Sequence, residues 1–348
     1  MEFALSEDQR LLQESVTGFL TDAASLDVMR KIADGDGAAE VTLNEGITAM
    51  GLMGLHVPET MGGSGLGLLE ACLVQEALGY RVARSGFLAA TVAAHLLPDF
   101  HEDYPRGIAD GGMVFGLALT ELASRRDGAG VTSDGGRLTG TSLLADVPAA
   151  ASHVLVAGTD GSLHVVDTWS AAPMRTIDRT RAFSALSFDG TMAELSTRPH
   201  PSALAAARLL VAADTLGAAQ AMLDKAVEYA KERRQFGRVI GSFQAVKHLC
   251  AGMAAKLEPA RALVWHAAYA MDTRDPEALV MAHLARAHLA EVGTFVAKTA
   301  TEVHGGMGFT DLLGLHYWFK RIGVNRQLFG SPEQARQSAA ELQGFVTA

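Results

Sequence analysis

The sequence predicts an α+β chain of three domains: an N-terminal helical domain over residues 1–112, a central small β-barrel or sandwich over 113–200, and a C-terminal antiparallel four-helix bundle over 201–348. Two observations predict this order. In the first and last parts apolar residues recur at helical spacing, so each helix turns one face toward a core. In the middle part short apolar runs alternate with Gly, Asp, Ser and Pro clusters, which is typical of a β unit.

The N-terminal domain begins with a helix whose start is marked by Ser6 and Gln9, the spacing of a capping box. An apolar stripe follows at helical spacing, formed by Leu12, Val16, Phe19 and Leu20. Further helices are expected at residues 43–53, 68–80 and 86–97, the first of them after a Gly/Ala/Asp-rich connection near 34–40. Pro98 is expected to end the last of these helices.

The central domain is predicted from the runs MVFGLAL, RLTGTSLL, HVLVAG, LHVVD and FSALSF. Turn-forming residues separate these runs at the spacing of short strands. The stretch GRLTG, directly after VTSDG, is typical of a hairpin.

The C-terminal domain is predicted from long helices at 202–231, 241–272 and 276–303, with shorter ones near 312–326 and 332–346. Three long amphipathic helices with short links usually pack antiparallel as a bundle. Pro276 suits the first turn of its helix, with Asp275 as the cap. Pro259 falls inside a helix and is expected to kink or divide it.

Composition excludes several classes of protein. The net charge of −10 argues against nucleic acid and anionic membranes as partners. Two cysteines, Cys72 and Cys250, cannot form a disulfide framework, which favours a reducing compartment. No apolar run approaches the roughly 20 residues that cross a bilayer, and the first residues lack the pattern of a secretory signal. We therefore expect a cytoplasmic protein with no membrane insertion.

Generic nucleotide and metal motifs fit poorly. MGGSGLGLL and HGGMGF are rich in glycine, but neither follows a strand within a βαβ unit, which argues against a Rossmann site. His283 and His288 lie five residues apart, about 140° around a helix, so they do not share a face as metal ligands. We predict no metal site.

The order of motifs resembles the flavin-dependent acyl-CoA dehydrogenase family along essentially the full length. Two segments carry most of the resemblance: YAKERRQFGRVIGSFQAVKHLCAGMAAKLEPAR and EVHGGMGFTDLLGLHYWFKR, about 70 residues apart. GLMGLHVPETMGGSGLGLLEACLVQEALG, ALTELASRRD and LTGTSLL resemble earlier segments of the family. The resemblance implies FAD as cofactor, an acyl-CoA substrate and an electron-transfer flavoprotein as electron acceptor. In the family a carboxylate base removes the α-proton while the flavin accepts a hydride from the β-carbon.

The resemblance also implies a cofactor site shared between subunits, in which one β domain holds the flavin ring and the neighbouring bundle holds the ADP half. Arg233 would pair with the pyrophosphate, since a guanidinium fork suits phosphate oxygens. Phe236 would pack near the adenine and Gln244 would hydrogen-bond the nucleotide. Gly305 and Gly306 would let the backbone approach the ribose-phosphate. The remaining cofactor positions implied by the resemblance are Thr120, Gln235, Gly237 and Glu302.

Both positions that carry the family's catalytic Glu are changed. The C-terminal Y-E-G-T segment reads LFGS here, so Phe329 stands at the Glu position. In the other arrangement the Glu precedes an Arg in the first bundle helix, where Ala207 precedes Arg208. The catalytic base is therefore unknown. Other acids nearby, namely Asp214, Glu302 and Glu333, are expected to be surface or cap residues.

The flavin half departs from the family pattern as well. Leu122 replaces a Pro, and Arg125 and Arg126 stand where Gly-Ser would let the backbone meet the flavin. Glu302 replaces the usual Gln and adds a negative charge near a diphosphate.

These changes predict the base-lacking partner in a heteromeric α2β2 acyl-CoA dehydrogenase, of the kind that actinobacteria use on steroid side-chain CoA esters. Two alternatives stay open: a self-sufficient homo-oligomeric dehydrogenase with an unassigned base, and a non-catalytic scaffold on the same fold. The sequence does not separate a fatty from a steroid acyl group.

Overall fold

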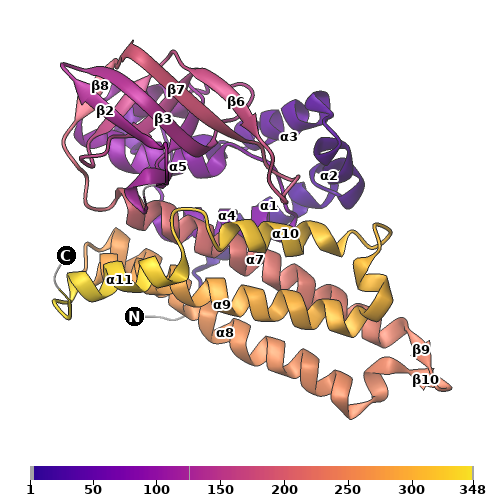
Figure 1. Ribbon diagram of the computed structural model, residues 1–348. Helices are drawn as coiled ribbons and strands as arrows, with labels where there is room; N and C mark the ends of the chain where they lie inside the picture. The colour runs from indigo at the N-terminus through magenta and orange to yellow at the C-terminus, as the bar shows by residue number, and fades with distance from the viewer. Residues whose placement is uncertain (1–3, 125, 347–348) are drawn as a thin grey trace.

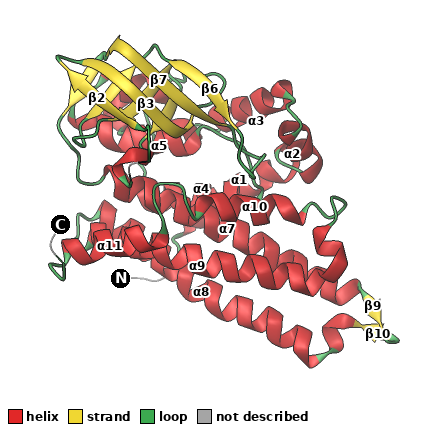
Figure 2. Cartoon of the chain, viewed as in Figure 1, coloured by secondary structure: helices red, strands yellow, loops and turns green. Residues whose placement is uncertain are grey.

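The computed structural model describes residues 4–124 and 126–346. A curved β-sheet and a bundle of long helices occupy opposite sides of the molecule, with N-terminal helices between and beside them (Figure 1). Figure 2 shows the same division by secondary structure, with the main strands gathered on one side. The predicted helical, β and helical order is confirmed. None of the described helices is both long and apolar enough to cross a membrane.

The N-terminal helices are α1 (Glu7–Ala23), α2 (Leu26–Ala33), α3 (Gly37–Ala49), α4 (Leu68–Tyr80), α5 (Phe87–Leu96) and α6 (Asp103–Ala109). The predicted capping box is confirmed: the Ser6 hydroxyl accepts from the Gln9 amide at 3.1 Å, and Gln9 Oε1 accepts from the Ser6 amide at 2.9 Å. Helix α3 starts earlier than the sequence predicts, because Asp36 caps it through the amides of Ala38 and Ala39. The connection expected near residues 34–40 is correspondingly shorter.

The central sheet has the strand order β6-β7-β3-β1-β4-β5-β8, with β2 paired to β3. Its strands are β1 (Phe115–Ala118), β2 (Gly130–Asp134), β3 (Arg137–Asp146), β4 (His153–Ala157), β5 (Leu163–Val166), β6 (Ser170–Met174), β7 (Phe183–Met192) and β8 (Leu195–Thr197). Strands β1 and β4 run parallel, and the other pairs are antiparallel. The hairpin predicted from VTSDG and GRLTG forms between β2 and β3.

Both faces of the sheet are buried at β4, which explains why its residues after His153 are all apolar. Val154 and Val156 point into a small core within the β domain, whereas Leu155 and Ala157 belong to the large core shared with the helices. Leu155 and Ala157, on the face of β4 that meets the large core, therefore attach the sheet to the helical domains.

The bundle contains α7 (Ala203–Glu232), α8 (Gln244–Asp272), α9 (Ala278–His304), α10 (Leu315–Asn325) and α11 (Pro332–Leu342). Glycines bring α4 and α7 close together: a Cβ at Gly79 or Gly217 would collide with the backbone carbonyl of Asp214 or Glu76, respectively. The N-terminal domain and the bundle thus share a backbone-to-backbone contact.

For the prolines of the bundle, a division of the helix at Pro259 is excluded, and the predicted place of Pro276 within the first turn of its helix is wrong. Pro259 lies inside α8, but the helix is not divided, because Leu257 and Ala260 on either side are fully buried and packing holds the helix across the missing amide. Pro276 precedes α9, which starts at Ala278, and the carboxylate of Asp275 accepts from the amide of Glu277 at 2.8 Å.

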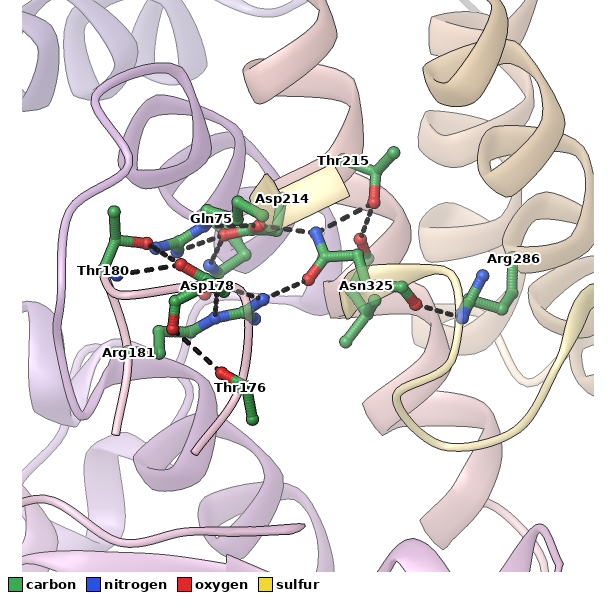
Figure 3. A network of polar contacts seen from close by, with 11 residues as sticks. Gln75, Thr176, Asp178, Thr180, Arg181, Asp214, Thr215, Arg286 and Asn325 are labelled. Carbon is green, nitrogen blue, oxygen red and sulfur yellow. Dashed lines mark hydrogen bonds and ion pairs between the residues drawn. The ribbon is translucent and has the colours of Figure 1, made fainter. Parts of the chain in front are cut away.

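A buried polar network joins the three domains (Figure 3). Asp214 of α7 is 1% exposed and accepts two hydrogen bonds from Arg321 of α10, at 2.9 and 2.6 Å. Gln75 of α4 donates to the same carboxylate at 2.9 Å, and Asn325 of α10 donates at 2.7 Å. The loop between β6 and β7 joins through Thr180, whose hydroxyl accepts from Arg321 at 3.2 Å. The expectation that Asp214 is a surface or cap acid is therefore wrong.

At this network, ion pairing and hydrogen bonding outweigh the free-energy cost of burying the ionised Asp214 carboxylate. Burial alone raises the pKa of Asp214, but Arg321, Arg181 and Asn325 together lower it to about 2. The carboxylate therefore stays ionised at neutral pH.

Substituting Asp214→Ala should lower the free energy of unfolding by about 3–5 kcal/mol, because it leaves Arg321 buried without its bidentate partner. Urea titration followed by circular dichroism measures this loss. The matched control is Asp34→Ala, which removes a more exposed ion pair to Arg179 of the β6–β7 loop. That control should cost no more than about 1 kcal/mol. Equal losses in the two variants would contradict the proposed role of the network.

Candidate functional site

Most of the predicted cofactor residues gather at one end of the bundle. Helix α7 ends there, the hairpin of β9 (Arg234–Gln235) and β10 (Arg238–Val239) projects from it, and α8 begins there (Figure 1). Helix α9 is antiparallel to α8 and ends at the same place, where the His304 ring stacks on Tyr229 of α7 with centroids 4.6 Å apart. The antiparallel packing therefore brings residues 233–244 and 302–306 to one end of the molecule.

The hairpin presents an aromatic ring to solvent. Phe236 and Gly237 form its turn, both with positive φ (52° and 77°), the pattern of a type I′ turn. A bulky residue in the left-handed region is unusual and points to a functional reason. The Phe236 side chain is 92% exposed and meets Phe243 edge-on, with centroids 6.1 Å apart. The ring is free to stack on a planar group.

The backbone at the end of α9 is accessible from solvent. Gly305 has φ 56° and ψ −138°, a conformation suited to glycine, and no atom lies within 4 Å of a Cβ built at Gly305 or Gly306. Both glycines are exposed, as is Glu302 one turn earlier. A ligand can approach this backbone closely, while the Glu302 carboxylate adds negative charge beside it.

The donors at this end suit an anionic nucleotide. Arg233 and Gln235 are exposed, and Gln244 is the exposed first residue of the 29-residue helix α8. No side chain caps the start of α8, so its first amides and the positive end of its dipole stay open. Exposed hydrogen-bond donors and the start of a helix therefore lie together here, an arrangement that suits an anionic ligand.

Thr120 is placed elsewhere, in a short 3-10 helix after β1. It is 1% exposed, and its hydroxyl has no partner among the described residues. The neighbouring Ala123 packs against Gly330, where an added Cβ would lie 2.9 Å from both the Ala123 Cβ and a guanidinium nitrogen of Arg208. Arg208 and Arg233, the residue that caps the end of α7, are 25 positions apart, which spans roughly 38 Å at about 1.5 Å per residue. One chain therefore does not bring Thr120 to the bundle end.

The flavin-side segment is already occupied by contacts within the chain. The Glu121 carboxylate accepts from the Ser142 hydroxyl at 2.6 Å and from the Leu143 amide at 2.9 Å. Arg126 is half-buried, and its Nη1 has no partner among the described residues. Arg125 lies outside the described residues. A cavity of about 380 Å³ also borders this segment, lined by residues 121–124 and 158–161.

The two positions of the family's catalytic Glu are buried and apolar. Ala207 is 0% exposed and Phe329 is 1% exposed. Phe329 has φ 56° and lies in the loop between α10 and α11. Its carbonyl accepts from Arg208 Nε at 2.9 Å, so the loop is held through its backbone. Neither position offers a group that can accept a proton.

Sequence reasoning missed a second arginine at this loop. Arg286 of α9 is 1% exposed and donates to the carbonyls of Asn325, Leu328 and Gly330, the last two at 3.1 and 3.2 Å. Its Nε has no partner among the described residues. The only signal in the sequence is a single cation in a run of Ala and Leu on α9.

Neither guanidinium forms an ion pair with a described carboxylate. Burial lowers the pKa of Arg208 to about 10 and, together with Arg208 and Arg326, lowers that of Arg286 to about 9. His283 lies 3.2 Å from Arg208 through its Nδ1. Burial and Arg208 lower the pKa of His283 to about 3, so this ring is neutral and accepts from the guanidinium. Among the described residues, no group of three or more His, Cys, Asp or Glu is arranged to hold a metal ion.

Comparison with known proteins finds similar chains along most of this sequence. Two family models match: acyl-CoA dehydrogenase, N-terminal domain at residues 6–100, and acyl-CoA dehydrogenase, C-terminal domain at residues 201–342. Acyl-CoA dehydrogenase IpdE2 of Mycolicibacterium smegmatis is 31% identical over 97% of this chain and 100% of its own length. The ChsE4–ChsE5 complex of Mycobacterium tuberculosis contains a chain that superposes with TM-score 0.89 at 25% identity, covering 99% of each chain. A Tcur3481–Tcur3483 steroid ACAD variant superposes with TM-score 0.88 at 28% identity, covering 97% of this chain and 98% of that one.

The helical, β and helical order and the open bundle end define a flavoprotein oxidoreductase fold. The chain belongs to the acyl-CoA dehydrogenase family.

The stability of the chain should fall as the pH decreases below about 6.5, in part because of His283. The unfolded chain takes up a proton near pH 6.5, whereas the folded ring resists protonation until about pH 3. Each such group lowers the free energy of unfolding by up to about 1.4 kcal/mol per pH unit in that window. Urea titrations at pH 7.5, 6 and 5 should show a shallower decline for His283→Gln than for the unchanged chain. His101→Gln, at an exposed position, is the control, and identical slopes in all three proteins would refute the assignment.

Proposed function

We propose that this chain is the base-lacking subunit of a heteromeric, FAD-dependent acyl-CoA dehydrogenase. It contributes the ADP half of an FAD site at a subunit interface, and an unlike partner contributes the flavin pocket and the base. FAD supplies the acceptor for the hydride that leaves the acyl thioester. This assembly is expected to be cytoplasmic and to pass electrons to an electron-transfer flavoprotein.

The observation that carries the proposal is the absence of an acid at the site where the family's base sits. Ala207 and Phe329 are both buried, and the ionisable side chains that hydrogen-bond around the Phe329 loop are Arg208, Arg286 and neutral His283 among the described residues. A cationic environment would stabilise a carboxylate, but among the described residues none forms an ion pair with either guanidinium. Proton abstraction therefore needs a base from another chain.

The bundle end supports the second half of the proposal. Arg233 would bind the pyrophosphate, Phe236 would stack on the adenine, and Gln244 with the first amides of α8 would hold the nucleotide. Gly305 and Gly306 would let the backbone approach the ribose-phosphate. Since α7 separates these residues from Thr120, an FAD bound here would extend to a different chain's β domain.

The relatives support a partner subunit. The similar solved structures include the ChsE4–ChsE5 complex, which pairs two different proteins, and a steroid ACAD built from Tcur3481 and Tcur3483. By this similarity the acyl group of the substrate is a steroid side chain in preference to a simple fatty acid.

The flavin content tests the proposal. Purified alone, the chain should carry far less than one FAD per chain and oxidise no acyl-CoA. Co-expressed with a dehydrogenase-like partner, it should give a yellow, active complex with one FAD for each pair of unlike subunits. One FAD per chain, with turnover that a single acid substitution abolishes, would instead establish a self-sufficient homo-oligomer. A colourless, inactive complex would establish a scaffold.

Substituting Arg233→Ala should weaken FAD binding by the assembled complex about tenfold to a hundredfold, because a charge-assisted contact with the pyrophosphate is lost. Fluorescence titration of the apo complex with FAD measures the dissociation constant. Arg274→Ala is the matched control, since Arg274 is also exposed but lies at the opposite end of α8. Equal affinity in the two variants would place the pyrophosphate elsewhere.

A further inference from the structure

A pocket of about 520 Å³ lies between the N-terminal helices and the β domain. It is lined by α3, the start of α5, the connection from α6 to β1, and the loop of residues 148–150 after β3. None of the described residues that line it belongs to the bundle helices or to the loop between α10 and α11. The pocket is therefore separate from both halves of the site described above.

The size and lining of the pocket are those of a small-molecule site. Its volume falls within the roughly 300–1,000 Å³ typical of such sites, which are mostly apolar with a few polar groups. Met53, Ile108, Met113 and Phe115 supply apolar walls. An open apolar pocket of this kind exposes hydrophobic surface to water, and a bound apolar body removes that surface.

Small residues on α5 leave the space open. Gly86 and Ala90 lie one helical turn apart on the face of α5 that borders the pocket. A Cβ at Gly86 would lie 3.3 Å from the ring of Pro148 and 3.9 Å from the end of Met53. A longer side chain at this position would fill the gap between these two residues.

The charged residues of the lining are all acidic. Glu40 is 9% exposed and forms an ion pair with Arg84 at 2.9 Å. Because Arg84 is not part of the pocket lining, it neutralises the charge of Glu40 from outside the pocket. Glu45, one and a half turns further along α3, is exposed and forms no ion pair within the described part of the chain. No Lys, Arg or His is among the described residues that line the pocket.

The polar groups deeper in the wall are already satisfied. The Asn44 amide donates to the carbonyls of Glu40 and Arg84, and its oxygen accepts from the Gly86 amide. The Thr48 hydroxyl donates to the Asn44 carbonyl at 2.9 Å. Among the described side chains of the lining, the carboxylate of Glu45 is therefore the charged group left to recognise the polar head of a ligand.

We propose that this pocket binds a compact, apolar small molecule that carries an amino group, with the apolar body between α3 and α5 and the ammonium beside Glu45. The acidic lining disfavours the phosphates of an acyl-CoA, so this ligand is not the substrate of the dehydrogenase reaction. The proposal does not depend on the proposed function, because it concerns a different cavity.

Three probes with one apolar body test the charge preference: adamantylamine, adamantanol and adamantanecarboxylate. Isothermal titration calorimetry with the full-length chain, alone or in complex with its partner, should rank their affinities in that order. The carboxylate should bind at least about tenfold more weakly than the amine, because like charges repel at the mouth. Equal binding of all three, the reverse order, or no binding at millimolar concentration would overturn the proposal.

Two variants place the binding in this pocket. Glu45→Lys should weaken adamantylamine about tenfold and strengthen adamantanecarboxylate, whereas Glu14→Lys, at an exposed position on α1, should change neither. Ala49→Trp adds bulk at an exposed position of the lining and should reduce binding of all three probes at least tenfold. Unchanged affinities in Glu45→Lys would overturn the proposal even if Ala49→Trp failed to fold.

Discussion

The buried ion pair between Asp214 and Arg321 is the constraint on which the arrangement of the domains depends. Two charges removed from water are tolerated only when they meet each other and enough hydrogen-bond partners. Here the partners come from α4, α7, α10 and the β6–β7 loop. Because the network is complete only when these elements meet, it specifies one relative placement of the N-terminal helices, the sheet and the bundle.

Strong local patterns made much of the fold predictable. The helix expected at 68–80 is α4 with the same limits, and the capping box at Ser6 forms as expected. The weaker pattern before residue 43 hid the start of α3, since the signal there is one capping side chain, Asp36. A single capping residue is a weak signal within a stretch whose Gly, Ala and Asp content is typical of a loop.

The buried charges were less predictable than the helices, because burial of a charge depends on packing between distant segments. Asp214 stands in the sequence among alanines, and nothing nearby indicates that Arg321, more than 100 residues later, will meet it. The burial of Arg286 is equally hard to predict, because the carbonyls to which it donates come from a separate segment of the chain. The residues at the bundle end were easier to foresee, because ERRQFG and HGGMG are contiguous motifs. A contiguous motif can be recognised in the sequence, whereas a network of buried charges from distant segments can be recognised only in the folded structure.

The anchoring of the loop that contains Phe329 has an evolutionary consequence. Arg208 and Arg286 donate to carbonyl oxygens, which every amino acid possesses, so these anchors of the loop do not depend on which side chain stands at position 329. A substitution at this position would change the packing of the core around the buried ring but would leave the hydrogen bonds to the backbone in place. Over evolution the identity of residue 329 could therefore change more readily than the path of the backbone around it.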